Sequence, residues 1–137
     1  MSHVRTQIRQ AAVAALATVG KVSASRTWPI PEEEIPLLIV TTDDEEIARG
    51  TLDSYARTLT LVVDAVAKGQ FVDDDLDDLV AATETAINRS TLGGLCKPLT
   101  LASIAISIDR GAALIGRARM TYSCLYFTNP TNPSSAM

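Results

Sequence analysis

The chain has 137 residues, a mass of 14.6 kDa and a formal charge of −4, from 12 basic and 16 acidic residues. This is the length of one domain that can bury a real core. The acidic balance and the scattered lysines and arginines exclude a nucleic-acid binder held by phosphate contacts, which needs a basic stripe. The N-terminal apolar stretch is interrupted by Arg5, Arg9 and Gly20, so it is too short and too charged to span a bilayer.

The first predicted element is an alanine-rich helix over residues 4–19. Its apolar residues recur with the spacing of one helix face, Ser2 can cap its start, and Gly20 ends it. His3, the only histidine, is expected to lie in a frayed terminus. Residues 21–28 predict a first strand.

Residues 26–40, RTWPIPEEEIPLLIV, contain three prolines within eight positions. Each proline removes a backbone donor and restricts φ, so residues 29–36 cannot continue a β-ladder. The run therefore predicts a rigid acidic hinge between two strands. The second strand, residues 36–42, is apolar enough to be buried on both faces.

Residues 43–55, DDEEIARGTLDSY, are expected to be a charged connection with Gly50 in its middle. A third strand is predicted over residues 56–67, because apolar and polar residues alternate there with a period of two. The alternation places one set of side chains on a single face: Leu59, Leu61, Val63 and Ala65.

The acidic run of residues 73–78 introduces the clearest predicted helix, whose apolar face extends to Ile87. Acids at a helix start complement the positive end of its dipole, and this interpretation is favoured over a cation site because the run lacks the glycine and glutamate of a calcium loop. Residues 99–109 and 116–127 predict two last strands. Residues 128–137 contain two Asn-Pro steps and predict a mobile or extended tail.

The predicted fold class is α+β, with the order α-β-β-β-α-β-β over a single domain, residues 1–127, and a flexible C-terminal tail, residues 128–137. Two helices pack on one face of a mostly antiparallel five-stranded sheet. The opposite face is too apolar for a solvated surface, so either the sheet bends on itself or neighbouring subunits cover it. The residues that lead to this expectation are Thr58, Thr60, Val62, Val66, Leu101, Leu125 and Phe127.

No catalytic, cofactor-binding or metal site is predicted. One histidine is too few for a zinc site of the usual kind, and its terminal position excludes a Ser-His-Asp triad. Cys96 and Cys124 lack CxxC spacing, and buried reduced thiols are favoured over a disulfide because no signal peptide is visible. Arg117 and Arg119 share one strand face and can pair with acids of the same or another subunit.

Five segments together define a layout: AAVAALATV, RTWPIPEEEIPLLIV, LDSYARTLTLVVDAVA, DLDDLVAATETAI followed by TLGGL, and the final strand ARMTYSCLYF. This layout resembles the tail terminator proteins of long-tailed phages, the family of the minor tail protein U of lambda-like phages. The resemblance covers about residues 3–127 and lies in the pattern and order of elements.

The resemblance implies a structural virion protein and not an enzyme. Such proteins form a homohexameric ring on the completed tail tube, end tube polymerisation and present the surface to which the neck of the filled head attaches. The implied partners are further copies of the chain, the tail tube protein and a neck or head-completion protein, with no membrane. The implied location is the head-proximal end of the virion tail, after assembly in the host cytoplasm. DNA passes through the ring without specific binding, and an acidic chain is consistent with this.

The candidate assembly residues lie in the hinge, in the charged connection and on the last strand, where they are expected to contact other subunits or the tube. They are Arg26, Trp28, Glu32, Glu33, Asp43, Asp44, Glu45, Glu46, Arg49, Asp53, Tyr55, Arg117 and Arg119. Two alternatives remain open: a neck or head-completion protein of the head–tail junction, and a small enzyme that uses the acidic loops with a divalent metal.

Overall fold

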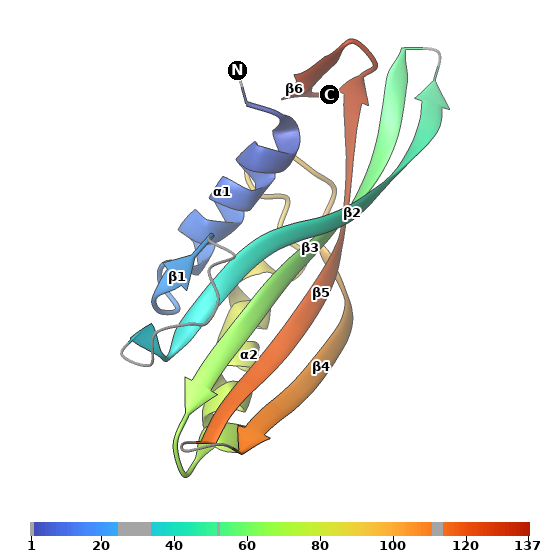
Figure 1. Ribbon diagram of the computed structural model, residues 1–137. Coiled ribbons are helices and arrows are strands. Elements are labelled where there is room, and N and C mark those ends of the chain that lie inside the picture. Colours follow the sequence, from blue (N-terminus) through green and yellow to red (C-terminus); the bar gives the residue numbers. More distant parts are fainter. Residues whose placement is uncertain (1, 25–33, 52, 111–113) are drawn as a thin grey trace.

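The computed structural model describes residues 2–24, 34–51, 53–110 and 114–137, which form a long twisted sheet with two helices against one face (Figure 1). The candidate residues of the hinge, Arg26, Trp28, Glu32 and Glu33, lie outside the described residues. In chain order the elements are α1 (Val4–Leu16), β1 (Val22–Ser23), β2 (Leu37–Thr51), β3 (Ser54–Lys68), α2 (Val72–Ile87), β4 (Thr100–Arg110), β5 (Leu114–Asn129) and β6 (Asn132–Ala136).

Among the described residues the sheet has six strands, in the order β1-β2-β3-β5-β4, with β6 paired to the end of β5. β1 runs parallel to β2, and the other described pairs are antiparallel. The α+β class with two helices is as predicted, but the sheet has one strand more than the predicted five. The difference is β6, which lies in the segment expected to be a flexible tail. It pairs with Thr128 and Asn129, and Gln7 of α1 donates a hydrogen bond to the carbonyl of Ser134 at 2.8 Å.

The predicted charged connection is instead the outer part of a hairpin, because β2 continues to Thr51 and β3 begins at Ser54. The ribbons of these two strands extend past the helices at the upper right of Figure 1. Charged residues suit a strand in this place, because several side chains of outer β2, including Glu46 and Arg49, are exposed to solvent. The prediction of a loop from the charge of residues 43–55 therefore ended the second strand too early, at residue 42.

The main core lies between the helices and one face of the sheet. The predicted inward set of β3, Leu59 to Ala65 in alternation, is fully buried there, as are Met120, Tyr122, Cys124 and Tyr126 of β5. Helix α2 approaches the sheet at Gly116, where an added Cβ would lie 2.7 Å from Leu76 Cδ1 and 2.7 Å from Val72 Cγ2. The absence of a side chain at this glycine therefore sets how closely α2 packs on β5.

Helix α1 buries Val4, Ile8, Ala12 and Leu16, which recur every four residues along one face. Its cap differs from the prediction, since His3 and not Ser2 is the capping residue. His3 Nδ1 accepts a hydrogen bond from the backbone N–H of Arg5 at 3.0 Å. The histidine that was expected in a frayed terminus thus stabilises the start of the helix.

The opposite face of the sheet is partly covered within the single chain. Ile35, Leu37, Ile39 and Val66 form a second, smaller buried cluster there, and Ile115 packs against it. This part of the face is therefore buried within the single chain, and it needs no neighbouring subunit to cover it.

Leu101 was assigned to that opposite face, and this was wrong. A register shift between Leu101 and Ser103 places Leu101 opposite Tyr122 and Ile104 opposite Met120. Leu101 therefore faces the helices and packs against the main core. A β-bulge of this kind changes the alternation by one residue, which a strict period of two cannot anticipate.

Cys96 and Cys124 are both buried free thiols, in agreement with the favoured interpretation of the sequence. The segments that carry them lie side by side: the N–H of Lys97, which follows Cys96, donates to the carbonyl of Leu125, which follows Cys124, at 2.8 Å. The hydrogen bond with Cys96, together with burial, raises the pKa of the Cys124 thiol, so that thiol stays protonated at neutral pH.

Candidate assembly interface

The outer part of the β2–β3 hairpin, residues 45–59, is called the arm below. Across it Glu45 stands opposite Leu59, Ile47 opposite Arg57, and Arg49 opposite Tyr55. Because Leu59 faces the helices, the alternation puts this whole set on the helix side of the sheet.

The arm begins at a bulge that turns one acid inward. The register shifts between Thr42 and Glu45, so Asp43 and Asp44 together stand opposite the single residue Thr60, and β2 has one extra residue at this point. Thr42 and Glu45 consequently lie on the same face although they are three residues apart. Asp43 and Asp44 remain exposed, whereas Glu45 points into the protein.

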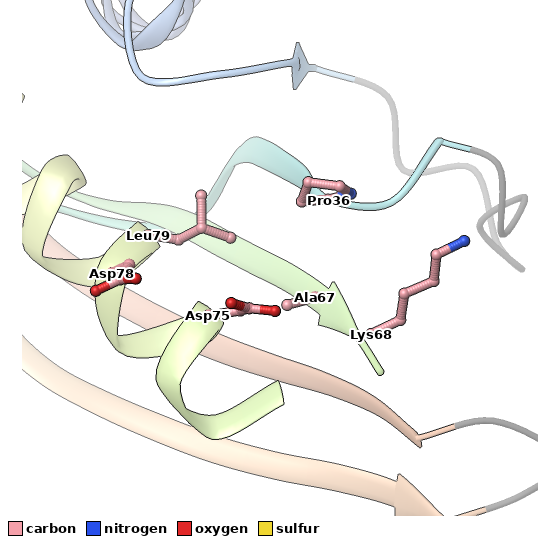
Figure 2. Close-up of a pocket in the computed structure, with 6 residues that line it drawn as sticks. All are labelled: Pro36, Ala67, Lys68, Asp75, Asp78 and Leu79. Carbon is pink, nitrogen blue, oxygen red and sulfur yellow. The ribbon is translucent and has the colours of Figure 1, made fainter. Parts of the chain in front are cut away.

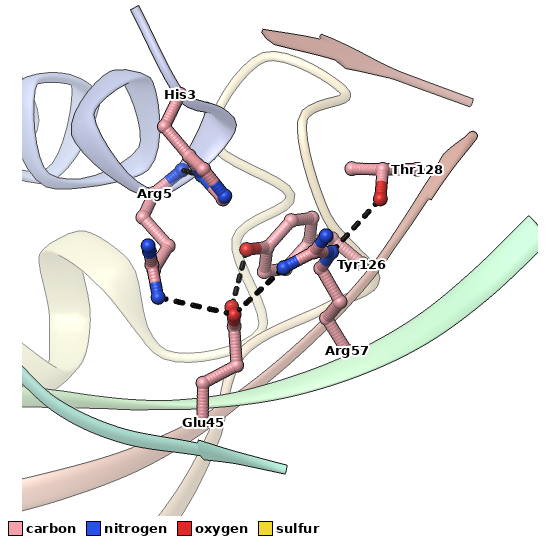
Figure 3. Close-up of polar contacts among 6 residues, drawn as sticks. All are labelled: His3, Arg5, Glu45, Arg57, Tyr126 and Thr128. Carbon is pink, nitrogen blue, oxygen red and sulfur yellow. Dashed lines mark hydrogen bonds and ion pairs between the residues drawn. The ribbon is translucent and has the colours of Figure 1, made fainter. Parts of the chain in front are cut away.

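Glu45 is the centre of a buried polar cluster at the root of the arm (Figure 3). Its carboxylate lies 3.0 Å from Arg57 Nη1 and 3.3 Å from Arg5 Nη1, and it accepts a hydrogen bond from the hydroxyl of Tyr126. Arg57 Nε donates to Thr128 Oγ1 at 2.8 Å. The cluster therefore joins α1, β2, β3 and β5, and it supplies the partners that a buried charge requires.

Two pKa shifts follow from this burial. Burial and the hydrogen bond with the Glu45 carboxylate raise the pKa of the Tyr126 hydroxyl, which therefore stays a donor. Burial lowers the pKa of His3, and the charges of Arg5 and Arg57 lower it further. A neutral imidazole retains a nitrogen that can accept a hydrogen bond, which is what the cap of α1 uses.

On the other face of the sheet, Arg119 and Asp64 stand directly opposite each other on β5 and β3. Arg119 Nε lies 3.1 Å from Asp64 Oδ1, and its second nitrogen, Nη2, lies 3.4 Å from Oδ2. The hydrogen bond with Asp64 raises the pKa of Arg119. Arg117 shares this face, opposite Val66, so the predicted common face of the two arginines is confirmed. The acid that pairs with Arg119 belongs to the same chain.

The structure thus separates the candidate residues into two groups. The arginine pair lies on the helix-free face of β5, and the remaining described candidates lie in the bulge or the arm. Tyr55 is half-buried, and its ring centroid lies 5.6 Å from the guanidinium carbon of Arg57. The side chain of Glu45 is buried, and the exposed members of the second group are Asp43, Asp44, Glu46, Arg49 and Asp53.

Strand β4 adds a surface that sequence reasoning missed. The alternation along β4 puts Ile104 and Ile106 on the helix side of the sheet, opposite Met120 and Ala118. Yet 40% of Ile104 and 54% of Ile106 are exposed. Among the described elements, α2 packs on β3 and β5 and leaves this edge strand mostly uncovered.

An open pocket of about 400 Å³ lies between α2 and the adjoining ends of β2 and β3 (Figure 2). It is lined by Asp75, Asp78 and Leu79 of the helix, and by Pro36, Ala67 and Lys68. Within the described part of the chain, no three His, Cys, Asp or Glu residues are grouped so that they could hold a metal ion. No described helix is long and apolar enough to cross a membrane.

The fold and these surfaces define an α+β protein whose sheet has a covered face, a projecting arm and an exposed apolar edge strand. Its sequence matches no protein-family model, and no curated protein matches it either. Its fold is similar to that of a chain in the virion of a native gene transfer agent particle, with a TM-score of 0.54 and 16% sequence identity. The match covers 90% of this chain and 90% of that chain. At this identity, the likeness shows a shared fold.

Proposed function

We propose that this protein is a structural virion protein that caps the completed tail tube of a phage or phage-like particle as a homohexameric ring. The ring ends tube polymerisation and provides the surface to which the neck of the head attaches. The observation that most supports this role is the fold, shared over nine tenths of both chains with a chain of a virion particle. The resemblance of the sequence pattern to tail terminators supports the more specific position.

The surfaces of the chain are consistent with repeated assembly. A ring is built from a contact between two different patches of the same chain. The projecting arm and the β4 edge are two such patches, and each exposes a large apolar side chain, Ile47 and Ile106 respectively. Exposed apolar surface of this kind is typical of protein–protein contacts. The charge of −4 is consistent with a channel through which DNA passes without being held.

Deletion of the gene that encodes this protein tests the terminator role. The length of the tails that are then produced is measured by electron microscopy. Without a terminator, the tube continues to polymerise, so we expect overlong tails. Native mass and negative-stain images of the purified protein, alone and added to tail tubes, are expected to show sixfold rings. Tails of normal length in the deletion would contradict the role.

A neck or head-completion protein of the same junction is the second candidate. The fold likeness supports a virion protein as such, and it therefore supports this candidate equally. The same deletion separates the two functions, since loss of a neck protein leaves tails of normal length that fail to join heads. Restoration by purified protein, added either to tails or to heads, then identifies the side on which it acts.

A small enzyme that uses acidic loops with a divalent metal belongs to a different class. Its best location would be the pocket beside Asp75 and Asp78. Calorimetric titration with magnesium, calcium and manganese tests it directly. We expect no heat of binding, and saturable binding of any of the three ions would reopen this class.

A further inference from the structure

The described sheet has two open stretches of strand edge, one at each end of the strand order. On one side, β1 pairs with β2 only at Leu38 and Ile39, so no described strand lies outside the arm. On the other side, β4 has β5 as its only described strand partner. An open edge presents a row of backbone donors and acceptors that can pair with a further strand.

Both edges carry exposed isoleucines on the same face of the sheet. Ile47 of the arm lies opposite Arg57, on the helix side, and 53% of it is exposed. Ile104 and Ile106 of β4 also lie on the helix side. Each edge therefore combines a strand that has no described strand on its outer side with exposed apolar side chains, which water does not favour.

We propose that β4 of one copy pairs with the β2 strand of the arm of a second copy, so that the sheet continues from one subunit to the next. Strand direction alternates across β2, β3, β5 and β4. Two copies in the same orientation therefore place β4 antiparallel to β2, and their helix faces remain on the same side. Ile47 of the second copy then lies beside Ile104 and Ile106 of the first, which removes these side chains from water.

The partner of each edge is a second copy of the chain, because the β4 edge and the arm edge of the same chain fit each other. The arm provides a strand of the required direction, and it brings an isoleucine to the face where β4 has two. This contact rests on the proposed function, in which the chain associates with itself, and it specifies which two edges meet. It joins two different surfaces, so repetition closes a ring or extends a filament.

The two edges are offset along the strands, and the offset is consistent with a ring. Ile106 is aligned through Ala118 with Ala65 of β3, whereas Ile47 is aligned with Arg57 of the same strand. The step from Arg57 to Ala65 is roughly 26 Å at about 3.3 Å per residue. A sheet that continues with such a stagger has strands tilted to the axis of assembly, which closure into a barrel requires.

The test is cross-linking between two variants of the full chain, Ile47→Cys and Ile106→Cys, prepared separately. When they are mixed under a mild thiol oxidant, we expect a disulfide-linked pair of twice the chain mass, formed in the mixture and not from either variant alone. The matched control replaces Ile47→Cys by Ala48→Cys, whose position faces the other side of the sheet, and its linked product is expected to be lost. The parent chain, whose cysteines are buried, gives the background.

A second measurement uses Ile106→Glu, which adds a charge to the β4 edge and is expected to cause loss of the assembled species in native mass spectra. Ala81→Glu adds the same charge at an exposed position of α2 and should leave assembly intact.

Rings that form without the Ile47→Cys/Ile106→Cys link would overturn this contact and leave the proposed function standing. Linked open filaments would support the contact and contradict the ring. A chain that stays monomeric, alone and with tail tubes, and gives no link would overturn both.

Discussion

Glu45 and Arg57 form a 3.0 Å salt bridge in which only 3% of one side chain and 9% of the other is accessible to solvent. The pair lies where the arm leaves the body of the protein, and Tyr126 and Arg5 complete it. Removing two charges from water is costly unless each is matched by good geometry and further hydrogen bonds. The cluster therefore ties the direction of the arm to the packing of α1 and β5.

Replacing Glu45→Gln should destabilise the fold by about 3 kcal/mol, because it leaves the buried guanidinium of Arg57 without its counter-charge. Urea denaturation followed by circular dichroism measures the change in the free energy of unfolding. The matched control is Glu46→Gln on the next, exposed residue, with an expected change within about 0.5 kcal/mol. Equal stability of the two variants would show that the cluster does not hold the arm.

The two core tyrosines of β5 should respond in opposite ways to loss of their hydroxyl groups. Tyr126 donates to Glu45, so Tyr126→Phe is expected to cost about 1.5–3 kcal/mol, the range for a hydrogen bond to a charged group. The buried hydroxyl of Tyr122 has no hydrogen-bond partner among the described residues. Tyr122→Phe should therefore be neutral or stabilising in the same urea experiment. Destabilisation of similar size in both would contradict this assignment.

Alkaline pH should destabilise the protein through these same residues. Burial raises the pKa of Tyr122 to about 12, from the ordinary value of 10. Above pH 10 the unfolded chain loses the proton that the folded chain keeps, so the unfolded state binds fewer protons and stability falls as pH rises from 10 towards 12. Urea midpoints measured at roughly pH 9 and pH 11 test this. The double variant Tyr122→Phe/Tyr126→Phe should show a smaller loss, and an unchanged loss would exclude the tyrosines as its source.

Gly116→Ala should weaken the packing of α2 on the sheet. The added methyl group would overlap Leu76, Val72 and Ile108, and overpacking of this kind costs about 1–3 kcal/mol. Gly20→Ala is the control, since a Cβ there meets nothing within 4 Å. Thermal unfolding monitored by circular dichroism compares the two variants. A stable Gly116→Ala protein would mean that α2 can shift without loss.

Charge reversal at Arg117 and Arg119 should weaken assembly, as expected if this face of β5 contacts another subunit or the tube. Arg119→Glu also places a carboxylate opposite Asp64, so folding stability must be measured alongside. Asp64→Asn breaks the same ion pair without adding a charge, and it should cost up to about 1 kcal/mol because Arg119 is half-exposed. Unchanged rings and unchanged tail length in the reversed double variant would exclude this face from assembly.

The sequence predicted the elements whose patterns are local. The spacing of apolar residues predicted α1, the acidic run predicted where α2 begins, and the alternation of β3 identified its buried side chains. The helix-side core could therefore be predicted well. The strand predicted over residues 116–127 corresponds to β5, and Arg117 and Arg119 lie on one face of it as predicted.

The sequence did not predict features that depend on register or on distant partners. Glu45 is one of four consecutive acids, and only the bulge before it turns it towards Arg57. Ile104 and Ile106 have the alternation of a buried strand, but burial there depends on how far α2 reaches across the sheet. The segment that forms β6 has little apolar content, and its order comes from pairing with β5.

The bulge at residues 43–44 sets which side chains of the arm face the interior. Side chains alternate between the faces of a strand, so a change of one residue exchanges the faces of everything that follows it. If β2 paired regularly through Asp43 and Asp44, without the bulge, Glu46 would stand where Ile47 now stands and Glu45 would be withdrawn from the interior. Deleting Asp44, by contrast, would remove the bulge and keep Glu45 opposite Leu59. The chemistry that the arm offers to a neighbour is thus set by the bulge as well as by residue type, so a rearrangement that removes the bulge without removing a residue would change the surface of the arm with no change in composition.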